Sequence, residues 1–216
     1  QAGIEMDIPV VRTDTFTNVW REENTDPDAP GVFESINDLN AFENEIANLQ
    51  REVTEIILYA QGNPEDQGTT TIQTWHESYV EQAGTGYEPH IYIDIHGAVR
   101  RGRPLSIELP SDALSRHDKR SIVIHIESSS YPYTKHTDRS LKRLLSSIYK
   151  ARPGIQVFGY GDITTERELT PYFDVDRYIK NTFGKENIKG YDPSKSKSLT
   201  IEELSSFNEG SEYDTN

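Results

Sequence analysis

Histidines and one nearby carboxylate are the residues of this sequence that could hold a metal ion. His90 and His125 fall in segments that alternate like β-strands, and Glu127 follows two positions after His125. Two imidazoles and a carboxylate are a known zinc ligand set, so a His/His/Glu zinc site is one interpretation. The interpretation we favour is that both histidines are hydrogen-bonded residues of a sheet. His117 and His136 fall in predicted loops, the first within 105–120.

Other reactive side chains carry less information. The sequence contains no cysteine, which excludes thiolate chemistry and disulfides. The run Ser128-Ser129-Ser130 lacks the strand–turn–helix context of a nucleophilic serine. We interpret Glu202-Glu203 as solvated charge rather than as paired catalytic acids. None of these groups predicts a reaction.

Length and charge restrict the class of protein. The 216 residues suffice for one core and an appendage, and a hydrophobic content of 34% predicts that part of the chain is exposed until a partner covers it. A formal charge of −14 argues against nucleic-acid binding and against an anionic membrane surface. No apolar run approaches the roughly 20 residues of a membrane span, and we expect no signal peptide.

The stretch from Gly84 to Pro104 has the pattern of a β-hairpin. Residues 90–94 alternate apolar and other side chains, His96-Gly97 is a turn signal, and 99–101 form the return strand. Gly102-Arg103-Pro104 ends it. The sequence therefore predicts a half-buried hairpin that holds His90.

Strands and helices are expected to alternate on both sides of this hairpin. Apolar runs predict strands over 54–60, 121–127 and 155–160, and helical periodicity predicts helices over 69–83 and 137–151. His76 is expected on the surface of the predicted helix 69–83. The alternation predicts an α/β fold with a mixed, mostly parallel central sheet flanked by helices.

A further helix is predicted from Asp38 to Val53, with Asp38 as its cap. Its apolar positions recur as a single stripe, so the helix either lies on its own domain, which we favour, or contacts another chain. Together with two aromatic residues further upstream, the stripe gives the candidate partner-binding residues: Phe16, Trp20, Leu39, Phe42, Ile46 and Leu49.

These elements divide the chain into four parts. Residues 1–37 are predicted to form an extended N-terminal arm, and 38–53 the amphipathic helix that leads into the domain. Residues 54–184 form the domain, and 185–216 an acidic C-terminal tail with a short helix from Thr200 towards Phe207. We expect the arm and the tail to bury surface against other chains.

Several short motifs occur in a defined order along residues 53–183. They are Glu88-Pro89-His90-Ile91, His96-Gly97, Gly102-Arg103-Pro104, Phe158-Gly159-Tyr160-Gly161-Asp162-Ile163 and Pro171-Tyr172-Phe173-Asp174. In this order they resemble the zinc-dependent N-acetylmuramoyl-L-alanine amidases and the related peptidoglycan recognition proteins. The resemblance implies the same mixed sheet with helices on both faces.

The resemblance also implies a catalytic zinc with three protein ligands and an open position for water. By position, the two histidine ligands of the family fall on Tyr59 and Tyr160, and the third ligand falls near Glu168. With this fold, Tyr59 and Tyr160 should lie near one another at the carboxyl ends of neighbouring strands. The assisting lysine falls on Glu166. The assisting tyrosine and glutamate, and a substrate-contacting histidine, fall on these positions: Pro89, His125 and, approximately, Ala113.

These replacements remove the chemistry that the resemblance implies. A phenol has an unperturbed pKa near ~10 and binds Zn²⁺ poorly unless it is deprotonated. One remaining carboxylate does not hold a catalytic zinc. We therefore expect no zinc, no other cofactor and no amidase activity.

The sequence thus predicts a pseudoenzyme: an amidase-like structural or docking protein whose partners are other protein subunits. Amidase domains with short structural arms resemble components of tailed-phage virions, which implies a place in a phage tail or baseplate. One alternative is a module that binds peptidoglycan without cleavage. The other is an active amidase, a cell-wall lysin.

Overall fold

The computed structural model describes residues 34–61, 72–83, 86–110, 114, 116–127, 134–166, 169–195 and 199–207. The predicted partner-binding residues Phe16 and Trp20 lie outside this range, and so do Ala113 and Glu168. No helix in the described ranges is long and apolar enough to cross a membrane.

Five strands form one mixed sheet with the order β3-β2-β4-β1-β5. The strands are β1 (Glu55–Ala60), β2 (Ile91–Ile93), β3 (Val99–Arg101), β4 (Ser121–Ile126) and β5 (Gln156–Gly159). β1 pairs in parallel with β4 and β5, β2 pairs in parallel with β4, and only the β2–β3 pair among these is antiparallel. The prediction of a mixed, mostly parallel sheet is confirmed.

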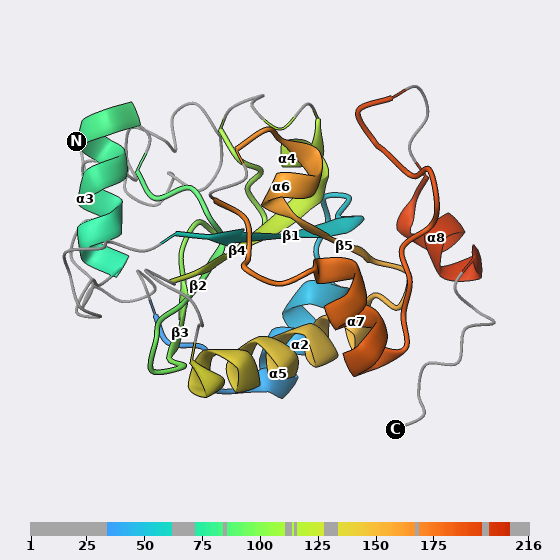
Figure 1. The fold of residues 1–216 in the computed structure, drawn as a ribbon, viewed down its shortest axis with the longest axis horizontal. Helices are drawn as coiled ribbons and strands as arrows, with labels where there is room; N and C mark the ends of the chain where they lie inside the picture. Colours follow the sequence, from blue (N-terminus) through green and yellow to red (C-terminus); the bar gives the residue numbers. More distant parts are fainter. Residues whose placement is uncertain are drawn as a thin grey trace.

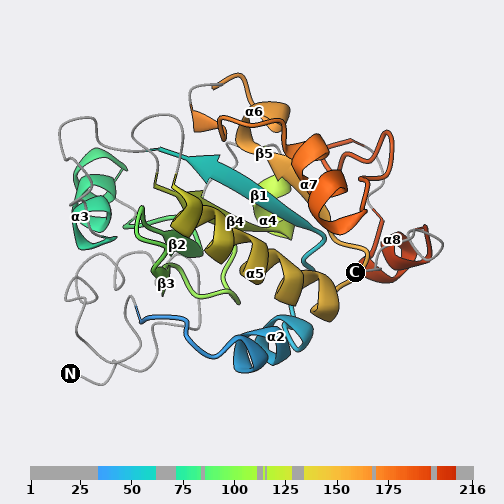
Figure 2. The same cartoon turned by 60° about the horizontal axis from the view of Figure 1, so that its bottom comes forward.

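Helices cover both faces of the sheet (Figure 1). On one face lie α2 (Leu39–Ala47), α5 (Lys135–Ala151) and α7 (Val175–Phe183). On the other face lie α3 (Ile72–Ala83), α4 (His117–Arg120) and α6 (Tyr160–Ile163). Figure 2 shows α2 beside α5, and α8 (Ile201–Phe207) at the end of the molecule that α5 leads to.

The alternation of side chains along β1 separates two cores. Ile56 and Leu58 point into the main core, where they join the apolar residues of α2, α5 and α7. Ile57 and Tyr59 point to the opposite face and pack with Leu109. That second face holds the candidate site described below.

The β2–β3 hairpin forms as predicted. The Asp94 carboxylate accepts hydrogen bonds from the backbone N–H groups of His96 (2.9 Å) and Ala98 (2.8 Å). Gly97 adopts a φ of +87°, a conformation that glycine reaches without a steric cost. Residues 34–36 of the predicted arm pair with the outer edge of β3, through Arg101 N–H to Glu34 O and Ile36 N–H to Val99 O.

Helix α2 is shorter than predicted, because it ends at Ala47 rather than Val53. Its start is confirmed, since Asp38 Oδ1 accepts from the N–H groups of Asn40 and Ala41, both at 3.0 Å. At its end, the Arg152 guanidinium donates to the carbonyls of Ile46 (3.0 Å) and Leu49 (3.2 Å). Arg152, the C-cap residue of α5, thus supplies hydrogen bonds to carbonyls at the end of α2 that would otherwise lack a partner within the helix.

The stripe on α2 faces the domain itself. Phe42 and Ile46 have no exposed surface and belong to the main core, and Leu39 and Leu49 pack against it while partly buried. The assignment of Phe42 and Ile46 to a partner surface is therefore wrong in this arrangement, because the chain's own core covers them. The favoured interpretation, a helix lying on its own domain, agrees with this packing.

Two further predictions about local structure are corrected. Helix α5 begins at Lys135 rather than Thr137, because Thr134 Oγ1 caps it by accepting from Thr137 N–H at 3.1 Å, so His136 is on a helix and not in a loop. The predicted loop 105–120 contains α4, which places His117 on a helix as well.

Residues that follow α7 pack on the edge of the sheet, although we predicted that the tail starts at residue 185. Asn187 satisfies both backbone groups of Val157, accepting from its N–H and donating to its carbonyl, each at 2.9 Å. Lys185 donates to Pro153 O at 2.9 Å. Leu204 of α8 is buried too. This segment therefore covers the edge that β5 would otherwise expose.

We expect Phe42→Ala to lower the free energy of unfolding by about 3–5 kcal/mol, because it leaves a cavity in the main core. Chemical denaturation of the full chain measures this. Asn40→Ala, on the exposed side of the same helix, is the matched control and should cost less than about 0.5 kcal/mol. A Phe42→Ala loss as small as the control's would show that α2 is not packed on its own domain.

Candidate functional site

Tyr59 and Tyr160 meet at the carboxyl ends of two neighbouring strands. Tyr59 is the fifth residue of β1, and Tyr160 directly follows β5. Their ring centroids are 5.0 Å apart with an interplanar angle of 73°, an edge-to-face contact. The prediction that these two residues lie near one another is confirmed.

Tyr160 was predicted as the last residue of a strand but begins α6. The reason is Asp162, whose Oδ2 accepts from Gly159 N–H at 2.9 Å and so turns the chain into a helix directly after β5. The turn directs the phenol towards Tyr59. Its hydroxyl donates to Glu166 Oε1 at 3.2 Å, which brings the predicted lysine position into the same site.

Hydrogen bonds hold the Tyr59 phenol in place, and burial keeps it neutral. Its hydroxyl donates to Gln61 Oε1 and lies 3.5 Å from the Tyr79 hydroxyl. Burial raises the pKa of Tyr59 to about 12, and the charges of Glu88 and Glu166 act in the same direction. At neutral pH this oxygen is therefore protonated and does not offer the phenolate that a zinc ion would need.

His125, the predicted position of a catalytic base, lies fully buried beneath Tyr59 with ring centroids 5.0 Å apart. Gln61 O lies 3.0 Å from Nε2 and can only accept, so Nε2 carries the proton; Nδ1 then accepts from the Tyr87 hydroxyl at 2.7 Å. Burial lowers the pKa of His125 to about 4. Both nitrogens are engaged, and the ring is neutral.

His90 is held in the same way on the strand next to β4. Val123 N–H donates to Nδ1 at 3.0 Å, and Nε2 donates to Ile107 O at 2.8 Å. Burial, and after it the charge of Arg51, lower the pKa of His90 well below its ordinary value. His90 and His125 are thus hydrogen-bonded sheet residues, as the favoured interpretation states.

The alternative zinc site of His90, His125 and Glu127 does not form. Glu127 accepts from the Tyr92 hydroxyl at 2.8 Å, and both imidazoles already use their nitrogens. Across the described ranges, no three His, Asp or Glu side chains are placed to hold a metal ion.

His76 was expected on the helix surface but is fully buried. Its Nδ1 accepts from Tyr87 N–H at 3.0 Å, and burial lowers its pKa to about 4. It therefore anchors the segment that follows α3, which carries Tyr87 and Glu88 towards the site.

A cavity of about 180 Å³ opens beside the two tyrosines. Three phenols, one carboxylate and the predicted position Pro89 contribute to its wall, and aliphatic side chains complete it. The lining residues are Tyr59, Tyr79, Glu88, Pro89, Leu109, Leu114, Val123, Tyr160 and Leu169.

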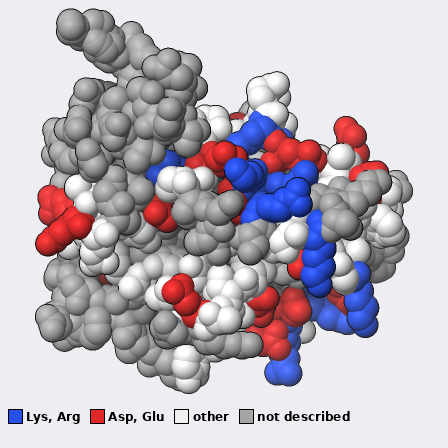
Figure 3. All heavy atoms as spheres, turned by 90° about the horizontal axis from the view of Figure 1, so that it is seen from above, with Lys and Arg blue, Asp and Glu red and all other residues white. Residues whose placement is uncertain are grey.

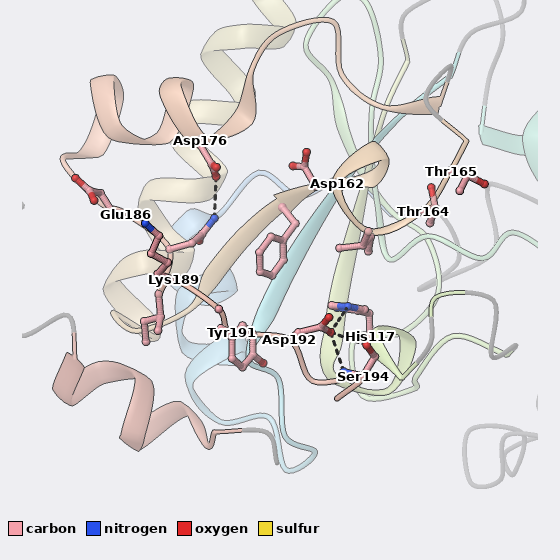
Figure 4. A pocket seen from close by; sticks show the side chains of 15 residues that line it. His117, Asp162, Thr164, Thr165, Asp176, Glu186, Lys189, Tyr191, Asp192 and Ser194 are labelled. Atoms are coloured by element: carbon pink, nitrogen blue, oxygen red, sulfur yellow. Dashed lines mark hydrogen bonds and ion pairs between the residues drawn. The ribbon is translucent and has the colours of Figure 1, made fainter. Parts of the chain in front are cut away.

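A second, larger cavity of about 800 Å³ lies between α4, α6, α7 and the segment 186–194 (Figure 4). His117 is at its base, between two carboxylates: Nδ1 lies 2.5 Å from Glu55 Oε1 and Nε2 lies 3.2 Å from Asp192 Oδ1. Ser194 donates its N–H (2.9 Å) and its hydroxyl (2.6 Å) to Asp192. Tyr191 donates to Glu55 Oε2 at 3.2 Å. With a carboxylate at each nitrogen, the imidazole donates from both.

The carboxylates determine the charge of His117. Burial alone would lower the pKa of His117, but the hydrogen bond and charge of Glu55, and then the charge of Asp192, raise it above the ordinary value of 6.5. Burial also raises the pKa of Glu55, against the opposing effect of His117. The folded protein therefore holds a proton at this cluster more tightly than the unfolded chain does.

The Glu55–His117–Asp192 cluster was not predicted from the sequence. Glu55 was interpreted as part of a buried strand, His117 as part of a loop and Asp192 as part of a tail. No spacing rule connects residues 62 positions apart, as Glu55 and His117 are. On the face seen in Figure 3, acidic and basic side chains are intermixed.

No family model matches the sequence, and no curated protein matches it. Solved structures do match the fold. An endolysin N-acetylmuramoyl-L-alanine amidase from Clostridium intestinale URNW is 19% identical with a TM-score of 0.51, covering 61% of this chain and 83% of its own. Drosophila PGRP-SD is 15% identical with a TM-score of 0.51, covering 73% of this chain and 90% of its own.

A mutant of Drosophila PGRP-LB, solved in complex with tracheal cytotoxin, is 13% identical with a TM-score of 0.51 and covers 61% of this chain and 82% of its own. At such identities the likeness concerns the fold. The fold is that of the N-acetylmuramoyl-L-alanine amidases and peptidoglycan recognition proteins, as the sequence motifs predicted.

We expect His117→Gln to cost about 3 kcal/mol near pH 6, since it leaves the buried Glu55 carboxylate without its charged partner. The raised pKa means that the stabilising contribution of His117 is complete below about 6.5 and is lost as the pH rises through the folded-state value. The wild-type protein should therefore lose stability over that interval, and the variant should show a smaller slope.

Urea unfolding at several pH values measures both effects. Lys195→Gln is the control, because Lys195 also lies near Asp192, at 3.9 Å, but its side chain is 78% exposed. It should change the unfolding free energy by less than about 0.5 kcal/mol. An unchanged pH slope in His117→Gln would contradict the assignment.

Proposed function

We propose that this chain uses the amidase fold without amidase chemistry, as a structural or docking protein. The observation that carries the proposal is the contact between Tyr59 and Tyr160, at the two positions where the resemblance places histidine ligands of zinc. Two packed phenols take the place of two imidazoles.

The surroundings support the same proposal. The Tyr59 phenol stays protonated at neutral pH, since its pKa is about 12. His125, at the position of the catalytic base, has both ring nitrogens engaged in hydrogen bonds. Glu166, at the position of the assisting lysine, adds negative charge where a developing oxyanion would need a positive one.

The proposed partners are other protein subunits, in the tail or baseplate of a tailed-phage virion. This placement rests on the resemblance and stays a prediction. The apolar residues Phe16 and Trp20 of the N-terminal arm, outside the described residues, are its candidate contacts. Leu39 and Leu49 are only partly buried by the domain and can extend such a contact.

A second candidate function is peptidoglycan binding without cleavage. The cavity beside Tyr59 and Tyr160 favours it, because a concave site remains where the catalytic centre of the fold would be. A mutant of Drosophila PGRP-LB, a protein of this fold, is solved in complex with tracheal cytotoxin.

We expect the purified native protein to contain less than about 0.1 zinc per chain and to release no soluble fragments from cell walls, because its strand-end tyrosines are neutral phenols. Elemental analysis and a wall-digestion assay on one sample measure this. A zinc amidase of the same fold is the positive control. Stoichiometric zinc together with digestion would restore the active-amidase alternative and overturn the proposal.

For the second candidate, we expect the protein to sediment with insoluble cell walls, and Tyr160→Ala to lower the bound fraction roughly tenfold by removing one wall of the cavity. Tyr172→Ala is the control, since Tyr172 is 65% exposed and is not among the residues lining the cavity. Equal losses in both variants, or no sedimentation of the wild type, would count against peptidoglycan binding.

A further inference from the structure

We propose that the cavity between Tyr59, Tyr79 and Tyr160 binds a quaternary ammonium group, such as that of choline or of a trimethylated amine. The inference rests on the proposed function in one respect, which is that no zinc ion occupies the same strand ends. On the proposed function, the histidine ligands of zinc are lost and the site has no assigned ligand. The inference assigns it a class of ligand.

The wall of the cavity is aromatic on several sides. Tyr59 and Tyr160 meet at an interplanar angle of 73°, so they form a corner rather than a flat stack. Tyr79 comes from α3 and closes the arrangement, with its hydroxyl 3.5 Å from that of Tyr59. Aromatic rings set at steep angles around a small volume are the arrangement by which proteins bind methylated ammonium ions.

The charge of the cavity suits a cation. Among the described residues that line it, Glu88 carries the only charge. Glu166 accepts a hydrogen bond from the Tyr160 hydroxyl and adds a second carboxylate beside the ring. Arg103 is buried and donates from Nε to the Glu88 carbonyl at 3.2 Å, but it does not line the cavity. Of these described residues, the two carboxylates and the one guanidinium sum to a net negative charge.

The phenols themselves add no charge at neutral pH. Burial raises the pKa of Tyr59 to about 12 and that of Tyr79 and Tyr160 above their ordinary value as well. The rings therefore present neutral, electron-rich faces, and Glu88 and Glu166 supply the negative potential.

The size and polarity of the cavity select the kind of ammonium. A volume of about 180 Å³ is below the ~300 Å³ at which sites for whole drug-sized molecules begin, so the cavity holds a small head group. Most of its wall is aromatic or aliphatic. A primary ammonium would lose water there without recovering three hydrogen bonds, whereas a quaternary one has none to lose.

The test titrates the full chain, after treatment with a chelator, with three probes: choline, n-butylammonium and 3,3-dimethylbutan-1-ol, the uncharged isostere of choline. Calorimetry gives the affinities, and NMR of ¹³C-labelled tyrosine rings locates the site. We expect choline to bind roughly tenfold more tightly than the isostere and to shift the ring signals of Tyr59 and Tyr160. Equal binding of choline and the isostere would overturn the proposal, and equal binding of butylammonium would overturn the preference for a quaternary ion.

Variants test the assigned residues. Glu88→Gln and Tyr160→Leu should each weaken choline binding roughly tenfold, because each removes one attraction to the cation. Glu202→Gln and Tyr172→Leu remove the same groups from exposed positions outside the cavity and should bind as the wild type does. If Tyr160→Leu does not fold, Glu88→Gln and the uncharged isostere still test whether the cavity binds choline as a cation. Choline binding that survives both cavity variants places the ligand elsewhere and overturns the assignment.

The zinc content of the same preparation, measured before chelation, separates this inference from the proposed function. Stoichiometric zinc with wall digestion overturns the proposed function whatever choline does. A zinc-free, inactive protein that does not bind choline leaves the proposed function in place and overturns the ammonium site alone.

Discussion

Parallel pairing of β1 with both β4 and β5 is the constraint on which the site depends. It fixes Tyr59 opposite His125 on one side and brings the end of β5, where Tyr160 follows, to the other. Because parallel strands end at the same edge of a sheet, Tyr59, His125 and Tyr160 meet there although they come from distant parts of the chain. In α/β folds this edge of the sheet is a common place for a ligand site, and the chemistry there depends on the residues that occupy it.

What occupies this edge is a set of neutral, hydrogen-bonded rings. His125 at this edge, and His90 at the amino end of β2, each donate from one nitrogen and accept at the other, and burial favours their uncharged forms. A buried imidazole in this state contributes specificity to the sheet and costs little, because no polar atom of the ring is left without a partner. The arrangement suits stable packing better than proton transfer, which needs a group that can change its charge.

Sequence reasoning reached the parts of the structure that depend on local pattern. The hairpin, the Asp38 cap and the proximity of Tyr59 to Tyr160 follow from turn chemistry, capping and the order of motifs, and each is observed. It failed where a distant side chain decides a local outcome. Arg152 caps the end of α2 although it lies 106 residues after Ile46 and 103 after Leu49 in the chain. Asp192, which follows the last of the family-like motifs, contacts His117. Such contacts form only in the folded chain, so no local sequence periodicity predicts them.

The two cavities show where ionisable groups are charged in this fold and where they are neutral. At Glu55, His117 and Asp192 the carboxylates hold a buried proton, and the segment after α7 is thereby tied to the sheet. At the strand ends, burial keeps the phenols of Tyr59 and Tyr160 and the imidazole of His125 uncharged, and among the described residues Glu88 and Glu166 supply carboxylates beside the rings. A site with neutral walls and carboxylates nearby attracts a cation without supplying ligands for a metal. By position, the phenols of Tyr59 and Tyr160 stand where the resemblance places histidine ligands of zinc, and we therefore propose that the site keeps a preference for positive charge but suits an organic cation instead of a metal ion.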